Sequence, residues 1–234
     1  MTSKADQRKA LAEGLDRLNE NMATLAELSE LAIRKAVDGL VRLDAAVADE
    51  VFMLDQEIYA LQVEIEKTCV DLLALHAPVA RDLRMITTSL KITTDFDRIG
   101  RYAKDISEIT LQFRGGETHF KKLVSIPRMA DLTIEMVDSA INAFLERDDV
   151  SAAKLPETDD SVDSLHDQVF REIVTYMMDS SVTIEAGAQY ILVSRYLERI
   201  ADHAVNIGER VVYMVTGERP PRIRAADRAK DKAP

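Results

Sequence analysis

The sequence predicts an all-α protein made of two tandem three-helix bundles. Three observations support this fold class: a scarcity of helix breakers, long apolar patterns with helical spacing, and an internal repeat. The 234 residues include only 8 Gly and 6 Pro. Apolar residues make up 47% of the chain, yet Trp is absent and aromatic residues are 5%. A core built largely from Leu, Ile, Val, Met and Ala favours helices over sheets.

Six long helices follow from apolar residues that recur every three or four positions. We expect three in the first half, over 7–46, 48–75 and 79–113, and three in the second half, over 121–147, 151–180 and 189–217.

Breaks between these helices follow from proline and glycine. His76-Ala77-Pro78 ends the second helix because proline disfavours helix in the residue before it, and Pro78 can open the third. Arg114-Gly115-Gly116 ends the third helix. Arg147-Asp148-Asp149 predicts a turn or kink, and Pro156 is placed to break the start of the fifth helix.

The two halves align with each other. An offset of 104 places Asp55 on Asp159, and after a loop an offset of 101 places Asp97 on Glu198. A three-residue length change in a loop is tolerated in a duplicated domain, and short connections make consecutive helices antiparallel. We therefore predict a first bundle at 1–117, a second bundle at 118–217, and a polar tail at 218–234 that is disordered.

Composition excludes several classes of protein. A net charge of −11 argues against nucleic acid as a partner, because phosphate contacts need a basic surface. The single cysteine, Cys69, rules out an internal disulfide and is expected to be a core residue. No signal-peptide core and no membrane-spanning run is found. We expect a cytoplasmic protein that reaches the membrane only through partners.

Carboxylates in the second half suggest a metal site. Asp159 and Asp163, like Glu198 and Asp202, are spaced i,i+4 and so share a helical face. Two such pairs facing each other across a bundle would repel unless a cation neutralised them. Hard divalent or trivalent cations prefer oxygen ligands, and facing bundle helices are known to hold such ions.

The first half has lost one member of each pair. Tyr59 occupies the position equivalent to Asp163, and Arg101 occupies the position equivalent to Asp202. Only Asp55 and Asp97 remain, and Arg101 can pair with Asp97 directly. A metal ion is therefore less expected in this half.

Two other interpretations of the carboxylates stay open. With 41 acids in the chain, about seven i,i+4 pairs arise by chance, so a solvated acidic face accounts for the spacing as well. His166 follows Asp163 by three positions, as in half of a di-iron site, so a di-metal enzyme using Asp159, Asp163, His166, Glu198 and Asp202 is the alternative. His203 should point elsewhere as a packing or surface residue. No phosphate-binding glycine loop or nucleophile–base pair is present, which argues against common enzyme classes.

Three motifs carry a resemblance to a known family. They are His76-Ala77-Pro78-Val79-Ala80-Arg81-Asp82-Leu83-Arg84, Asp97-Arg98-Ile99-Gly100, and Leu197-Glu198-Arg199-Ile200-Ala201-Asp202-His203-Ala204-Val205-Asn206-Ile207. Together with the repeat, they make the chain between about residues 8 and 217 resemble the PhoU family, which regulates phosphate transport in bacteria and archaea.

This resemblance implies a non-enzymatic, metal-binding regulator. Family members bind metal clusters through Glu/Asp-x-x-x-Asp motifs and link a phosphate-importing ABC transporter to a sensor histidine kinase, repressing the phosphate-starvation response. The motif is matched by Asp159, Asp163, Glu198 and Asp202, and in part by Asp55 and Asp97. The resemblance also implies a homodimer, located in the cytoplasm or at the inner membrane face. The metal (Fe, Zn, Mn or Mg) stays open, as do a metal-free adaptor and a relative with other partners or a transcriptional role.

Overall fold

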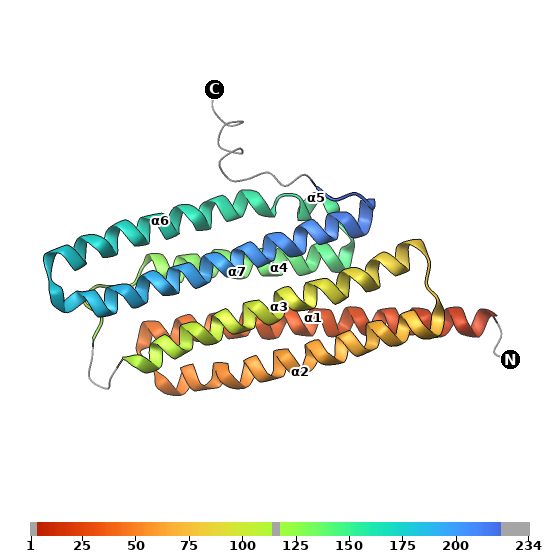
Figure 1. Ribbon diagram of the computed structural model, residues 1–234, viewed down its shortest axis with the longest axis horizontal. Helices are drawn as coiled ribbons and strands as arrows, with labels where there is room; N and C mark the ends of the chain where they lie inside the picture. The colour runs from red at the N-terminus through yellow and green to blue at the C-terminus, as the bar shows by residue number, and fades with distance from the viewer. Residues whose placement is uncertain (1–3, 114–117, 221–234) are drawn as a thin grey trace, which may run out of the picture.

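The computed structural model describes residues 4–113 and 118–220 of the chain. Long helices make up almost all of it, and the described residues form no strand (Figure 1). The elements are α1 Lys4–Arg42, α2 Ala45–His76, α3 Ala80–Gln112, α4 Ser125–Glu146, α5 Asp149–Ala152, α6 Leu155–Asp179, the 3₁₀ turn η1 Ser181–Thr183, and α7 Ile184–Thr216. The all-α prediction is confirmed.

Several helix ends differ from the sequence prediction. Helix α3 begins after an extended Val79, so Pro78 precedes the helix instead of lying in its first turn. Helix α7 begins at Ile184, before the predicted Gln189, because the turn η1 leads directly into it. Helix α3 ends at Gln112, whereas the predicted stop at 114–116 lies outside the described residues, as do 221–234 of the predicted tail.

The predicted turn after α4 is present. Arg147 has a left-handed backbone with φ 59°, and the side chain of Asp148 accepts hydrogen bonds from the first backbone N–H groups of α5. The fifth predicted helix is divided in two, because α5 ends at Ala152 and α6 starts at Leu155 with Pro156 in its first turn. Proline has no N–H to continue a preceding helix, but it is tolerated at a helix start.

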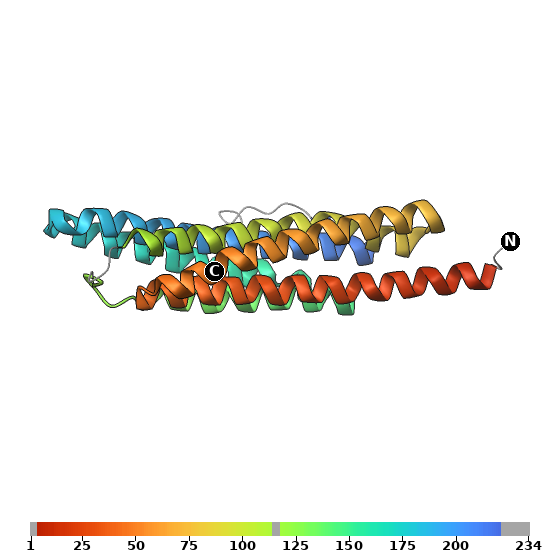
Figure 2. The same cartoon turned by 90° about the horizontal axis from the view of Figure 1, so that it is seen from below.

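Two bundles pack side by side. Helices α1, α2 and α3 contact one another, as do α4, α6 and α7, and the two groups meet where α3 packs on α7 and α1 on α4. Figure 1 shows α2 and α6 at the outer edges. Figure 2 shows α1 and α4 in one layer, with α3 and α7 in the layer above. The two main helix–helix contacts between the bundles therefore join helices that occupy equivalent positions in the repeat.

The core follows the apolar stripes of the helices. Leu18, Ile33, Phe96 and Leu197 are fully buried, each contributing about 1.5–3 kcal/mol by leaving water. Cys69 is also buried, as predicted, and burial raises the pKa of its thiol to about 12.

One glycine permits a close approach in the second bundle. A Cβ atom on Gly208 of α7 would lie 2.6 Å from the Leu155 side chain and 2.9 Å from the Ala152 carbonyl oxygen. This contact fixes the C-terminal half of α7 against the start of α6. No helix among the described residues is both long and apolar enough to cross a bilayer.

Candidate functional site

The predicted metal ligands lie on α6 and α7, which run antiparallel. His166 Nδ1 of α6 is 3.0 Å from Ser194 Oγ of α7, and Leu155 packs on Gly208. This register places Asp163 level with Glu198, and Asp159 level with Asp202. The fifth and sixth long helices thus bring the two pairs to the same height in the bundle.

Glu198 already has a cationic partner. Arg195, one helical turn earlier, donates from Nη1 to Glu198 Oε2, and His166 Nε2 lies 3.9 Å from the same oxygen. The side chain of Glu198 is 15% exposed. An ion pair at this degree of burial is screened less than a surface pair. A metal ion would have to displace Arg195 to bind both oxygens of Glu198.

The carboxyl of Asp202 has a raised pKa. Burial is the main cause that raises the pKa of its carboxyl, and the charge of Glu198 raises it further, while Arg199 lowers it. Arg199 Nη1 is 3.5 Å from Asp202 Oδ2, and both side chains are nearly half exposed. A bound cation would favour the charged form of Asp202, against both causes of the raised pKa.

On the facing helix, Asp159 is buried and Asp163 is half-buried. Among the residues that the structure describes, no group of three or more His, Cys, Asp and Glu side chains is arranged to hold a metal ion. The oxygen donors suit a hard cation, but in this conformation they do not converge. Metal binding by Asp159, Asp163, Glu198 and Asp202 therefore stays a prediction.

In the first half, each of the two retained acids forms an ion pair with a basic residue of the same bundle. Arg101 Nε is 3.0 Å from Asp97 Oδ2, which is the pairing that the sequence suggested. Lys104 Nζ is 3.6 Å from Asp55 Oδ2, and this second pairing was not predicted. Tyr59, which replaces an acid, is largely exposed. Each acid retained in this half thus has a base from α3 beside it.

His203 occupies the opposite, α3-facing side of α7, as predicted for a packing residue. Its Nδ1 donates to Asp95 Oδ1 of α3 at 2.9 Å, and its ring lies 5.9 Å from that of Tyr102. Arg210 Nε lies 3.1 Å from Asp95 Oδ2, as an ion pair without hydrogen-bond alignment. Asp95 is only 5% exposed, so it is a buried acid between two bases.

Asp95 was missed in the sequence, although a signal for it exists. It stands three residues after Ile92 and four before Ile99, on the apolar stripe of α3. An acid in such a stripe must have a partner, because burying an isolated charge is costly. The partner could not be identified, since His203 is 108 residues away in the chain.

The chain is similar to known proteins in both sequence and structure. The family model for the PhoU domain matches residues 22–110 and again 126–211. The phosphate-specific transport system accessory protein PhoU homolog of Deinococcus radiodurans is 34% identical, over 91% of this chain and 99% of that protein. The homolog of the same name from Aquifex aeolicus is 36% identical, over 89% of this chain and 94% of its own.

Two crystal structures show the same fold. PhoU from Pseudomonas aeruginosa superposes with a TM-score of 0.83 at 31% identity, covering 88% of this chain and 99% of that one. The phosphate transport system regulatory protein PhoU from Streptococcus pneumoniae gives a TM-score of 0.82 at 28% identity, covering 90% and 99%.

Proposed function

The chain belongs to the PhoU domain family, and from this membership we propose that it is a non-enzymatic accessory regulator of phosphate uptake. One observation carries the proposal: the two domain matches fall on the two bundles, and the named relatives align over nearly their whole length. By this proposal the protein represses the phosphate-starvation response when phosphate is plentiful.

Deleting the gene tests this function. In phosphate-rich medium, the deletion strain should express phosphate-starvation genes constitutively and accumulate phosphate. A reporter for a starvation promoter and radiolabelled phosphate uptake measure the two effects. The same reporter response in the parent and in the deletion strain, with unchanged uptake, would refute the proposal.

We propose that its partners are subunits of a phosphate ABC transporter and a sensor histidine kinase, at the cytoplasmic side of the membrane. The relatives' names tie them to a phosphate-specific transport system. Crosslinking in cells followed by capture of the tagged chain should recover both classes of protein. Recovery of neither would overturn this assignment, and light scattering of the pure protein tests the homodimer.

The metal ion is a separate proposal. Asp159, Asp163, Glu198 and Asp202 are proposed to bind a divalent or trivalent cation (Fe, Zn, Mn or Mg). Support comes from their common level on α6 and α7, from their oxygen donors, and from the raised pKa of Asp202. The cation would neutralise the carboxylates of both helices once Arg195 releases Glu198. The alternative of a di-metal enzyme receives no support from the geometry of these residues.

A further inference from the structure

A cleft of about 560 Å³ lies between the N-terminal half of α3 and the C-terminal half of α7. Its lining includes Thr88 and Lys91 from α3, and Asn206, Arg210 and Tyr213 from α7. It lies on the α3-facing side of α7, away from the carboxylates that face α6. Clefts of roughly 300–1,000 Å³ are the usual size of small-molecule sites.

The charge in this cleft is opposite to that of the chain. The chain has a net charge of −11, yet the cleft is lined by three cations, Lys91, Arg210 and Arg219, and by one acid, Glu209. In the part of the chain that the structure describes, neither Lys91 nor Arg219 has a carboxylate within 4.0 Å. The positive charges of Lys91 and Arg219 can therefore interact with an anionic ligand.

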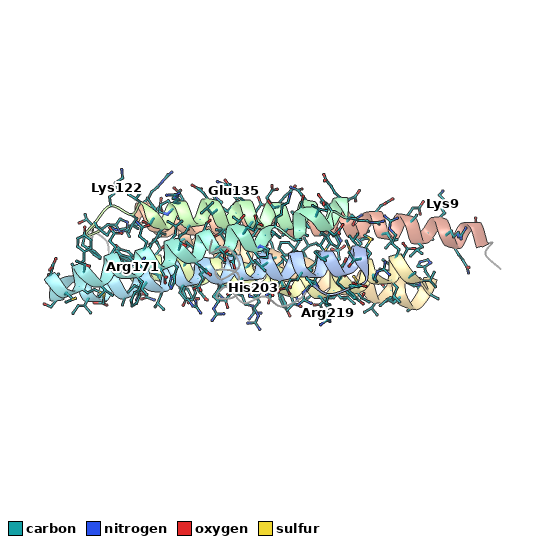
Figure 3. The ribbon with its side chains drawn as sticks, turned by 90° about the horizontal axis from the view of Figure 1, so that it is seen from above. Lys9, Lys122, Glu135, Arg171, His203 and Arg219 are labelled. Atoms are coloured by element: carbon teal, nitrogen blue, oxygen red, sulfur yellow. The ribbon has the colours of Figure 1, made fainter. Side chains whose placement is uncertain are left out.

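Two of the three cations are oriented by neighbours. The guanidinium of Arg219 lies 5.9 Å from the centre of the Tyr213 ring, a cation–π distance. Arg210 is held by the buried Asp95, which leaves its terminal nitrogens as donors. Figure 3 shows His203 and Arg219 on the same side of the bundle, opposite Lys122 and Glu135.

The basic surface continues beyond this cleft. A neighbouring hollow of about 290 Å³ is lined by Arg81, Arg84 and Arg147, with Glu146 as its acid. Arg84 Nε donates to the Met214 carbonyl oxygen at 3.0 Å, which ties α3 to the end of α7. Bases therefore outnumber acids along this end of the α3–α7 seam.

We propose that the α3–α7 cleft binds a phosphorylated small molecule of nucleotide size. Guanidinium and ammonium groups bind phosphate oxygens through short, charge-assisted hydrogen bonds. Lys91, Arg210 and Arg219 supply these groups, and the Asn206 amide and Thr88 hydroxyl add neutral hydrogen bonds. Inorganic phosphate and pyrophosphate fill only a small part of the cleft, so a nucleoside triphosphate matches its volume better. This inference rests on the cleft alone and not on the proposed function.

Isothermal titration of the full chain tests the proposal. Adenosine triphosphate, pyrophosphate and inorganic phosphate are the probes, with EDTA present so that a metal ion at the carboxylates cannot recruit them. Lys91→Gln and Arg219→Gln should each weaken triphosphate binding by about tenfold, as expected for one charge-assisted contact. Glu209→Gln should strengthen it, because it removes the repelling charge of the one acid that lines the cleft.

Matched controls remove the same charge elsewhere. Lys122 is an exposed cation just before α4, and Arg171 is an exposed cation on α6 (Figure 3). Lys122→Gln and Arg171→Gln should therefore leave the affinity unchanged. Circular dichroism checks that each variant is folded. The proposal is overturned if adenosine triphosphate does not bind at millimolar concentration, or if the controls weaken its binding as much as the cleft variants do. Binding of inorganic phosphate or pyrophosphate alone would also overturn it.

Discussion

On its α3 side, helix α7 presents His203 and Arg210 to a single buried acid, Asp95, whereas on its α6 side it carries Glu198 and Asp202 level with two further acids. Around Asp95, the charges of the α3–α7 seam are balanced within the fold. The second seam has more acids than bases: Arg195 and Arg199 pair with the acids of α7 itself. The difference separates charges that pair across the two bundles from carboxylates that gather between two helices of one bundle.

The two halves of the chain also differ in how their acids are paired. Arg101, at i+4 from Asp97, satisfies that acid within α3. In the second half the equivalent position is Asp202, and the base is Arg195, whose counterpart in the first half is Thr94. In the first half the base lies four residues after the acid, whereas in the second half it lies three residues before Glu198. Glu198 is therefore paired, and the position four residues after it can hold a second acid, Asp202.

The largest expected effect concerns Asp95, between α3 and α7. Asp95→Ala leaves His203 and Arg210 without their acid in a buried position, so we expect a loss of about 3 kcal/mol in the free energy of unfolding. Denaturant titration measures it. Asp55→Ala, at a more exposed acid, is the control and should cost about 1 kcal/mol or less. Equal losses for the two variants would show that the burial of Asp95 does not set the size of the effect.

A smaller effect is expected where α1 meets α4. Burial, and secondarily the charge of Asp138, raises the pKa of Glu30 from 4.5 to about 7. The folded state therefore binds this proton more tightly, and stability rises as pH falls from above 7 towards 4.5. Above pH 7 the charged Glu30 is destabilising, so Glu30→Gln should stabilise the protein by about 1–2 kcal/mol at pH 8.

Denaturation at pH 8 and at pH 4.5 checks this sign. The advantage of the Gln variant should vanish at the lower pH, where wild-type Glu30 is protonated. An advantage of the same size at both pH values would show that the charge of Glu30 is not its cause.

The smallest expected effect on stability concerns Asp202, in the acid-rich seam between α6 and α7. The raised pKa of Asp202 means that its charge is unfavourable in the metal-free protein at neutral pH. Because the side chain is 45% exposed, solvent screens this penalty, and Asp202→Asn should stabilise metal-free protein by only about 0.5 kcal/mol. Thermal unfolding in EDTA measures the change, and destabilisation by the Asn variant would contradict it.

Sequence reasoning succeeded for several neighbours on one helix, although it missed the pairing of Arg195 with Glu198 within α7. Periodicity predicted the long helices, and i,i+4 spacing predicted both acidic pairs and the Asp97–Arg101 pairing. It failed where partners come from different helices, as for Asp95 with His203 and Asp55 with Lys104. Those pairings depend on the register between helices, which one sequence does not display. The α5–α6 break was only half foreseen, since Pro156 is tolerated in the first turn of a helix.

Calorimetric titration of chelator-stripped protein with Mn²⁺, Zn²⁺, Mg²⁺ and Fe³⁺ most directly tests the claim that the acid-rich α6–α7 seam binds a cation. Wild-type protein and Asp55→Asn/Asp97→Asn should bind the preferred ion with equal affinity. Glu198→Gln/Asp202→Asn should lose at least about 100-fold, because two anionic ligands are removed. Binding that persists in Glu198→Gln/Asp202→Asn but is lost in Asp55→Asn/Asp97→Asn, or no binding of any ion by the wild type, would contradict this account.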